Sequence, residues 1–203
     1  MSKDAFWALI QEAKTACGQD LNAKNFHDIL QTYEDLADQY GLWDAVSVIK
    51  EYGCSDDGFI DFRAWLIAQG KEVYMNALRD PDTLADIEPY GDCCFECLSY
   101  VGDYAYEQLT GRSAYDEMEP DRIEKMRDEL KKDIVYKDGI QYPREPKDLP
   151  RFLPRLCEKY GGPERFLAAP STWNYDLHEI RRLLDEGKVQ DMATKKEKGG
   201  GAR

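Results

Sequence analysis

Apolar side chains recur at intervals of three and four residues along most of this chain, and glycines separate the segments in which they do so. Between 23 and 40, for example, Phe26, Ile29 and Tyr33 fall on one face of a helix. Glycine ends helices readily because it adopts the left-handed conformation without steric cost. The spacing therefore predicts helices over about 4–17 (with Asp4 as the cap), 23–40, 42–52, 56–69, 71–79 and 93–110, which end near Gly18, Gly41, Gly53, Gly70 and Gly111 or before Pro81.

In the last of these helices the same spacing directs five side chains toward the core: Phe95, Leu98, Val101, Ala105 and Leu109. A charged helix is predicted to begin near Pro120, with a narrow apolar face. Because Asp138-Gly139 lies between apolar residues, 134–143 is predicted to form a short hairpin. Prolines interrupt the chain after this point, and we expect short helices over about 149–160 and 175–187.

These elements predict a mainly α fold, a single domain of packed antiparallel helices with a small irregular C-terminal extension. Residues 1–112 form the helical core domain in this interpretation. Residues 113–192 supply the charged helix and a proline-rich extension that packs on the core. Residues 193–203, which are rich in Lys and Gly, are predicted to form a disordered tail.

The formal net charge of −13 restricts the class of partner. The last eleven residues hold four cations and one acid, so the rest of the chain carries −16. Nucleic acid and anionic membrane surfaces bind clustered Lys and Arg, and we expect neither as a partner. A basic protein partner, a cationic ligand and solubility alone all agree with this charge.

The first residues lack the pattern of a secretory leader, and no stretch reaches the roughly 18 apolar residues of a membrane span. We therefore expect a cytoplasmic protein whose six cysteines are thiols. The two histidines, His27 and His178, form no H-E-x-x-H motif, and the nucleotide-binding and nucleophile-elbow glycine motifs are absent. No catalytic residue is predicted.

A thiol, a hydroxyl and two carboxylates occupy residues 54–57, directly before an apolar helical segment. Ser55 as N-cap, with Asp56 and Asp57 in the first turn, is what capping and the helix dipole favour. Adjacent carboxylates project about 100° apart on a helix, so the two acids make no catalytic dyad but remain available to a basic partner. Cys54 is predicted to pack under this helix, and a nucleophilic role is its alternative.

Cys93, Cys94 and Cys97 form a second thiol group with one C-x-x-C spacing. A structural zinc site needs four ligands, so we predict no cofactor. Zinc remains an alternative, with Cys94 and Cys97 as its candidate ligands. The alternative function is accordingly a metal-binding or thiol-dependent enzyme that uses Cys54 or the group Cys93/Cys94/Cys97.

Acidic residues and tyrosines are mixed between 88 and 121, a composition suited to docking a basic protein, because charge steers association and aromatic rings give rigid contact area. Arg63 is predicted either to pair with an acid on a neighbouring helix or to line a cleft. The residues predicted to bind a partner are Asp56, Asp57, Arg63, Tyr90, Asp103, Tyr106, Glu107, Asp116 and Glu117.

Three stretches of the chain resemble a bacterial family of unknown function, DUF4240. They are Phe6-Trp7, the segment 42–86 that contains Gly-Cys-Ser-Asp-Asp-Gly-Phe, Phe-Arg-x-Trp-Leu-Ile and Asp-Pro-Asp, and YVGDYAYEQLTG at 100–111. The resemblance covers about residues 1–112, and 140–161 resembles an extension carried by some members. It implies a fold and no mechanism.

Charge and the lack of a catalytic constellation together favour one function. We expect an acidic cytoplasmic binding protein, immunity- or inhibitor-like, that engages a basic protein partner.

Overall fold

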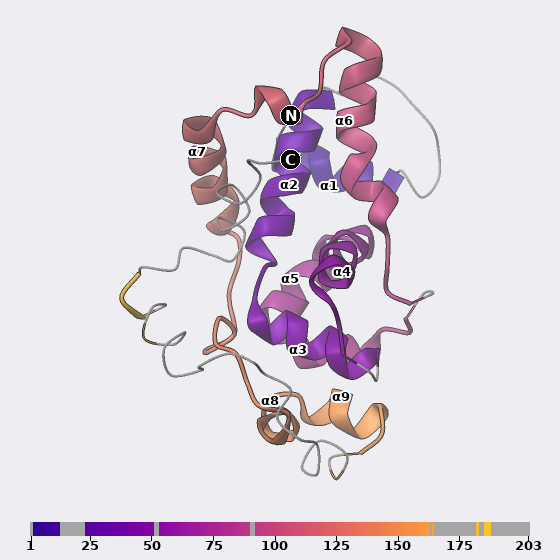
Figure 1. The fold of residues 1–203 in the computed structure, drawn as a ribbon, viewed down its shortest axis with the longest axis vertical. Coiled ribbons are helices and arrows are strands. Elements are labelled where there is room, and N and C mark those ends of the chain that lie inside the picture. The colour runs from indigo at the N-terminus through magenta and orange to yellow at the C-terminus, as the bar shows by residue number, and fades with distance from the viewer. Residues whose placement is uncertain are drawn as a thin grey trace, which may run out of the picture.

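The fold is seen in a computed structural model that describes residues 2–12, 23–50, 53–89 and 92–162, together with residues 164, 182 and 185–187. Over this part of the chain the secondary structure is helical and contains no strand, which confirms the mainly α prediction (Figure 1). The elements are α1 Lys3–Glu12, α2 Ala23–Leu36, α3 Tyr40–Ile49, α4 Asp56–Ala68, α5 Lys71–Arg79, the 3-10 helix η1 Pro81–Asp86, α6 Glu96–Thr110, the 3-10 helix η2 Tyr115–Glu117, α7 Pro120–Lys131, the 3-10 helix η3 Pro146–Asp148, α8 Leu149–Phe152 and α9 Pro154–Lys159.

An aromatic column along α4 forms the centre of the core. Trp43 stacks on Phe59, with ring centroids 4.8 Å apart, and the column continues through Phe62 to Trp65. Figure 1 shows α4 between the α2–α6 end of the molecule and the end that carries α8 and α9. Phe59, Phe62 and Trp65 are buried and Trp43 is partly buried, and aromatic side chains contribute much of the burial energy of a core.

A second aromatic group joins α1, α2 and α5 through hydrogen bonds as well as packing. The Trp7 indole N–H donates to Tyr33 Oη at 3.0 Å, and Tyr74 Oη donates to the Tyr33 carbonyl at 2.7 Å. Each buried polar ring atom in this pair of contacts therefore has a partner, as burial requires.

Several helix boundaries differ from the prediction; α6, for example, begins at Glu96 rather than near 93. Ser2, rather than Asp4, caps the first helix, because its Oγ accepts the N–H of Ala5 at 3.1 Å. The helix predicted over 23–40 ends at Leu36, and Tyr40 already belongs to α3. The intervening turn brings Asp38 against Arg63, which no local pattern indicates.

The prediction of a hairpin over 134–143 was wrong. The turn itself is present, since the N–H of Ile140 donates to the Lys137 carbonyl and Gly139 has a φ of +73°. The flanking backbone bonds to helices instead of to itself: Lys137 N–H donates to Leu78 O, and Ile140 O accepts from Gly41 N–H. A strand pair needs those same groups, so none forms.

The single helix predicted over 149–160 is two helices. α8 ends at Phe152, and Leu153 leaves the helical conformation, with φ −128° and ψ 58°, before Pro154 begins α9. Proline disfavours the helical conformation of the residue before it, which explains the break. The helix predicted over 175–187 and the tail over 193–203 lie outside the described residues, apart from 182 and 185–187.

The inward face predicted for α6 was correct for Leu98, which is buried, and wrong for three of the other side chains. Phe95, Val101 and Leu109 are exposed, and Leu109 reaches 74%. The face that is buried carries Leu98, Ser99 and Gly102. A Cβ on Gly102 would lie 2.7 Å from the Cα of His27, so the two backbones meet at a position where only glycine fits.

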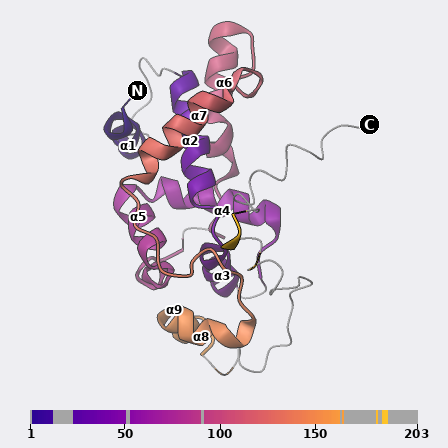
Figure 2. The ribbon, with the colours of Figure 1, turned by 90° about the vertical axis from the view of Figure 1, so that its left-hand side faces the viewer.

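Helix α7 lies across α2 on the side of the molecule seen in Figure 2. Its arginines make the contact: Arg122 pairs with Asp28 at 3.0 Å, and Arg127 pairs with Asp35 at 2.6 Å. The end of α7 adds Leu130 to the core. This charged helix is thus attached by ion pairs along its inner side and by the apolar contacts of Met126 and Leu130.

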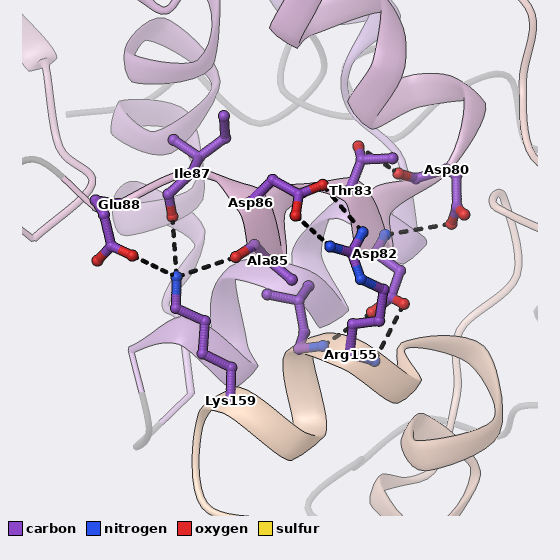
Figure 3. A network of polar contacts seen from close by, with 10 residues as sticks. Asp80, Asp82, Thr83, Ala85, Asp86, Ile87, Glu88, Arg155 and Lys159 are labelled. Atoms are coloured by element: carbon purple, nitrogen blue, oxygen red, sulfur yellow. Dashed lines mark hydrogen bonds and ion pairs between the residues drawn. The ribbon is translucent and has the colours of Figure 1, made fainter.

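The C-terminal extension is fixed to η1 by a polar clamp (Figure 3). The carboxylate of Asp82 accepts the N–H groups of Arg155 and Leu156 at 3.1 and 2.9 Å, so it satisfies first-turn donors of α9. Leu153, at the N-cap position, offers no side-chain acceptor of its own. An acid 73 residues earlier therefore acts as the cap of this helix.

Two exposed cation pairs complete the clamp. The Arg155 guanidinium binds the Asp86 carboxylate, and Lys159 Nζ donates to the carbonyls of Ala85 and Ile87 and to Glu88 Oε1 (Figure 3). Beneath the clamp, Leu156 and Cys157 are fully buried in the same core as α4. The hydrophobic core therefore continues into the extension.

Asp82→Ala is expected to lower the free energy of unfolding by about 1–3 kcal/mol, because it leaves two N–H donors at a largely buried helix end without an acceptor. Urea denaturation measures this change. Asp86→Ala is the matched control: its side chain is exposed, and we expect a change close to the error of the measurement. Equal losses in the two variants would contradict the capping role of Asp82.

Candidate functional site

Residues 54–57 form the start of a helix, as predicted. Ser55 Oγ accepts the N–H of Gly58 at 3.1 Å, and α4 begins at Asp56. Asp56 and Asp57 are exposed in the first turn, where their charge faces the positive end of the helix dipole. The half-buried Cys54 packs against the core.

Arg63 takes a structural position. Its side chain is 9% exposed and lies over the Phe59 ring at 5.1 Å. The guanidinium donates to the Glu34 carbonyl at 3.1 Å and pairs with Asp38 at 3.3 Å. Of the two predictions for Arg63, the ion pair with a neighbouring acid is the one that the structure shows. Because the side chain is buried, little of the guanidinium is accessible to a binding protein.

The thiols of Cys54, Cys93 and Cys94 lie near the amine of Lys50. Its Nζ is 3.4 Å from Cys94 Sγ, and a hollow of about 360 Å³ beside it is lined by Ile49, Lys50, Gly53, Pro89, Asp92 and Cys93. Burial raises the pKa of both Cys54 and Cys93 to about 11, against the lowering effect of Lys50. Burial also raises the pKa of Cys94. The reactive form of cysteine is the thiolate, so these three groups are mostly unreactive thiols near neutral pH.

Within the part of the chain that the structure describes, no group of three or more His, Cys, Asp or Glu residues is arranged to hold a metal ion. Cys94 is half-buried and Cys97 is exposed, so the two candidate zinc ligands differ in surroundings. The described residues also contain no helix with the length and apolar character needed to cross a bilayer.

Three of the predicted acidic and tyrosine residues hold the loop after α6. Asp103 accepts the Ser113 hydroxyl at 2.9 Å and the Ala114 N–H at 2.6 Å. Tyr106 Oη donates to the Glu117 carboxylate, which also pairs with Arg112. Asp103, Tyr106 and Glu117 are therefore engaged within the fold.

The other predicted residues of this region are Glu107, Asp116 and Tyr90. Glu107 and Asp116 are exposed, and both carboxylates are open to solvent. Tyr90 lies outside the described residues. Of the predicted acids in this region, Glu107 and Asp116 are thus the two best placed to meet a partner.

The structure adds an apolar surface that the sequence reasoning missed. Among the described residues, seven large apolar side chains are exposed, and six of them lie between 95 and 115. We call these six the α6 ridge: Phe95, Tyr100, Val101, Tyr104, Leu109 and Tyr115. Gly102 could have indicated part of it, because a glycine within a helix often marks a close approach, and Tyr100 and Tyr104 lie on the side of α6 opposite Gly102.

The α6 ridge is acidic as well as apolar. Residues 95–119 contain six carboxylates and one cation, Arg112. The rings of Tyr100 and Tyr104 lie 6.0 Å apart on the exposed side of α6. In Figure 1 the C-terminal half of α6 projects from the end of the molecule opposite α8 and α9. An aromatic, negatively charged helix face is thus presented to solvent.

A comparison with protein families supports the resemblance stated from the sequence. The model of a family described as "Protein of unknown function (DUF4240)" matches residues 20–108, which include α2 to η1 and nearly all of α6. Comparison with curated proteins and with solved structures finds no match. The motifs that carry the resemblance have structural roles here: Ser55 caps α4, Arg63 is a buried cation, and Asp82 caps α9.

The thiols allow a direct test of reactivity in the native protein. In a Cys17→Ser background at pH 7.5, we expect Cys97 to react first with an aromatic disulfide reagent, because it is exposed, and Cys93 and Cys157 to react only after unfolding. Adding Cys97→Ser should remove the fast phase. A fast phase that persists and maps to Cys54 or Cys93 would instead favour the thiol-dependent enzyme.

Proposed function

We propose that this protein is a non-catalytic binding protein, immunity- or inhibitor-like, that engages a basic protein partner through the α6 ridge. One observation carries the proposal: nearly all the exposed large apolar side chains of the described chain gather on a segment with six carboxylates and one cation. Scattered exposed apolar residues need no explanation, but neighbouring apolar side chains rimmed by charge are typical of an interaction site, and Tyr100, Tyr104 and Glu107 lie on one side of α6.

The composition of the ridge suits an interface rather than a solvated face. Tyr100 and Tyr104 offer large, rigid contact area, and tyrosine is among the residues that dominate binding energy. Their ring faces also attract Lys and Arg side chains through cation–π contacts. Glu107 and Asp116 lie in the same segment and add the charge that steers a basic partner.

The ridge is also held in place before any partner arrives. Asp103 fixes the chain after α6 through Ser113 and Ala114, and the contact of Tyr106 with Glu117 ties η2 back to the helix. A surface that is ordered before binding loses less conformational entropy when the partner binds. The partner expected from this chemistry is a Lys- or Arg-rich segment that also carries apolar side chains.

Tyr100→Ala combined with Tyr104→Ala should weaken binding of a fluorescent peptide of alternating Lys and Leu by about tenfold or more. Glu107→Lys with Asp116→Lys should weaken binding by a similar factor in 50 mM salt and less in 500 mM salt, because exposed charges are screened. Fluorescence anisotropy measures both affinities.

Glu124→Lys with Asp128→Lys is the matched control, since it makes the same charge change at two exposed positions of α7, which lies on the other side of α2 from α6 (Figure 1). We expect a smaller effect from it. The control could weaken binding as much as the Glu107→Lys/Asp116→Lys variant does. In that case binding depends only on net charge, and the α6 ridge is not the site.

A further inference from the structure

His27 is buried against Tyr115 of the α6 ridge. Its side chain is 0% exposed, and among the residues that the structure describes neither ring nitrogen has a hydrogen-bond partner. Buried polar atoms are nearly always paired, so two unpaired nitrogens on one ring are exceptional. A neutral imidazole tolerates this surrounding better than an imidazolium, which carries two N–H donors and a charge.

Two elements pack against His27, and they differ in how easily they can move. On α6, Gly102 touches the backbone of His27 so closely that a Cβ there would lie 2.7 Å away. On η2, the Tyr115 ring meets the imidazole edge to face, with centroids 4.3 Å apart at 84°. Tyr115 is itself 39% exposed. It is therefore the cover between His27 and solvent, and it lies on a helix of only three residues.

The charged groups around His27 are already engaged. On α2, Asp28 is paired with Lys24 at 2.6 Å and with Arg122 of α7 at 3.0 Å. On α6, Oδ1 of Asp103 accepts hydrogen bonds from Ser113 and Ala114. Burial lowers the pKa of His27, and Lys24 lowers it further, against the raising effects of Asp28 and Asp103.

We propose that His27 is a proton-sensitive latch on the α6 ridge: its protonation displaces Tyr115 and opens 113–118. Access to water decides which element moves. The imidazolium needs water or an acceptor, and α6 cannot withdraw without breaking its packing on α2. Displacing the Tyr115 ring exposes His27 to water with less disruption of the packing, because that ring is already partly exposed to solvent.

The sign of the pH dependence follows from the lowered pKa. The closed state is fully favoured above the ordinary histidine value of 6.5 and loses stability as the pH falls below it. Glu34, further along α2, titrates in the opposite sense: burial raises its pKa to about 7, so its protonation at lower pH removes a buried charge and stabilises the fold. Opening on acidification therefore cannot come from Glu34.

The latch would regulate the proposed binding site, and in that respect it rests on the proposed function. Tyr115 belongs to the α6 ridge, and Asp116 and Glu117 follow it on η2. Opening removes them from the surface offered to a basic partner, so affinity should fall below about pH 6. By linkage, a bound partner should hold His27 neutral to lower pH.

Amide hydrogen exchange of the full-length protein tests the latch without any partner. After correction for intrinsic exchange, protection over 113–118 should fall by about fivefold or more between pH 7.5 and 5.5, relative to α4. His27→Phe keeps an aromatic ring under Tyr115 but cannot be protonated, so it should abolish the loss. His178→Phe, at the chain's other histidine, is the matched control and should retain it.

An unchanged protection over 113–118 in the wild type, or an equal loss in His27→Phe, would overturn the proposal. If His27→Phe does not fold, an NMR titration of the wild type replaces it, following the imidazole of His27 and the ring of Tyr115 together. The two should change in one transition below pH 6.5, and a His27 that titrates without Tyr115 overturns the latch. Because neither measurement uses a partner, a negative result contradicts the latch and leaves the proposed binding function untouched.

Discussion

The buried guanidinium of Arg63 is the constraint on which the arrangement of the helices depends. A desolvated cation must be paired, and Nη1 of Arg63 donates to the Glu34 carbonyl and pairs with Asp38, at the C-terminal end of α2 and just beyond it. The contact joins α2 to α4 and coincides with the early end of α2. Because α2 in turn carries the contacts to α6 and α7, its position governs where the α6 ridge and the charged helix lie.

The strong negative charge of the chain is used in two ways. Some acids stabilise the fold: Asp28 and Asp35 receive the arginines of α7, and Asp82 caps α9. Others remain in solvent, and Glu107 and Asp116 lie on a segment that is also rich in exposed aromatic side chains. Net charge alone does not distinguish these two groups, since both contribute equally to −13.

Local features were predicted well where the determining groups are neighbours in sequence. The N-cap at Ser55 follows from a hydroxyl three residues before the N–H that it accepts, and α5 has the predicted bounds. Predictions failed where a distant group decided the outcome. The residues around Gly139 form no hairpin because Leu78 and Gly41 take the backbone groups, and α6 turns Val101 outward because Gly102 packs on His27.

The sequence by itself therefore determined the mainly α class, the start of α4 and the acidic character of the segment around α6, because periodicity, capping and charge are local or compositional properties. Only the tertiary structure decided which acids are paired, which face of α6 is exposed and where His27 lies. Those outcomes depend on which side chains meet across 60 to 100 residues of chain, as in the contacts of Ser99 with Glu34 and of Tyr136 with Leu36. No spacing within one helix contains that information.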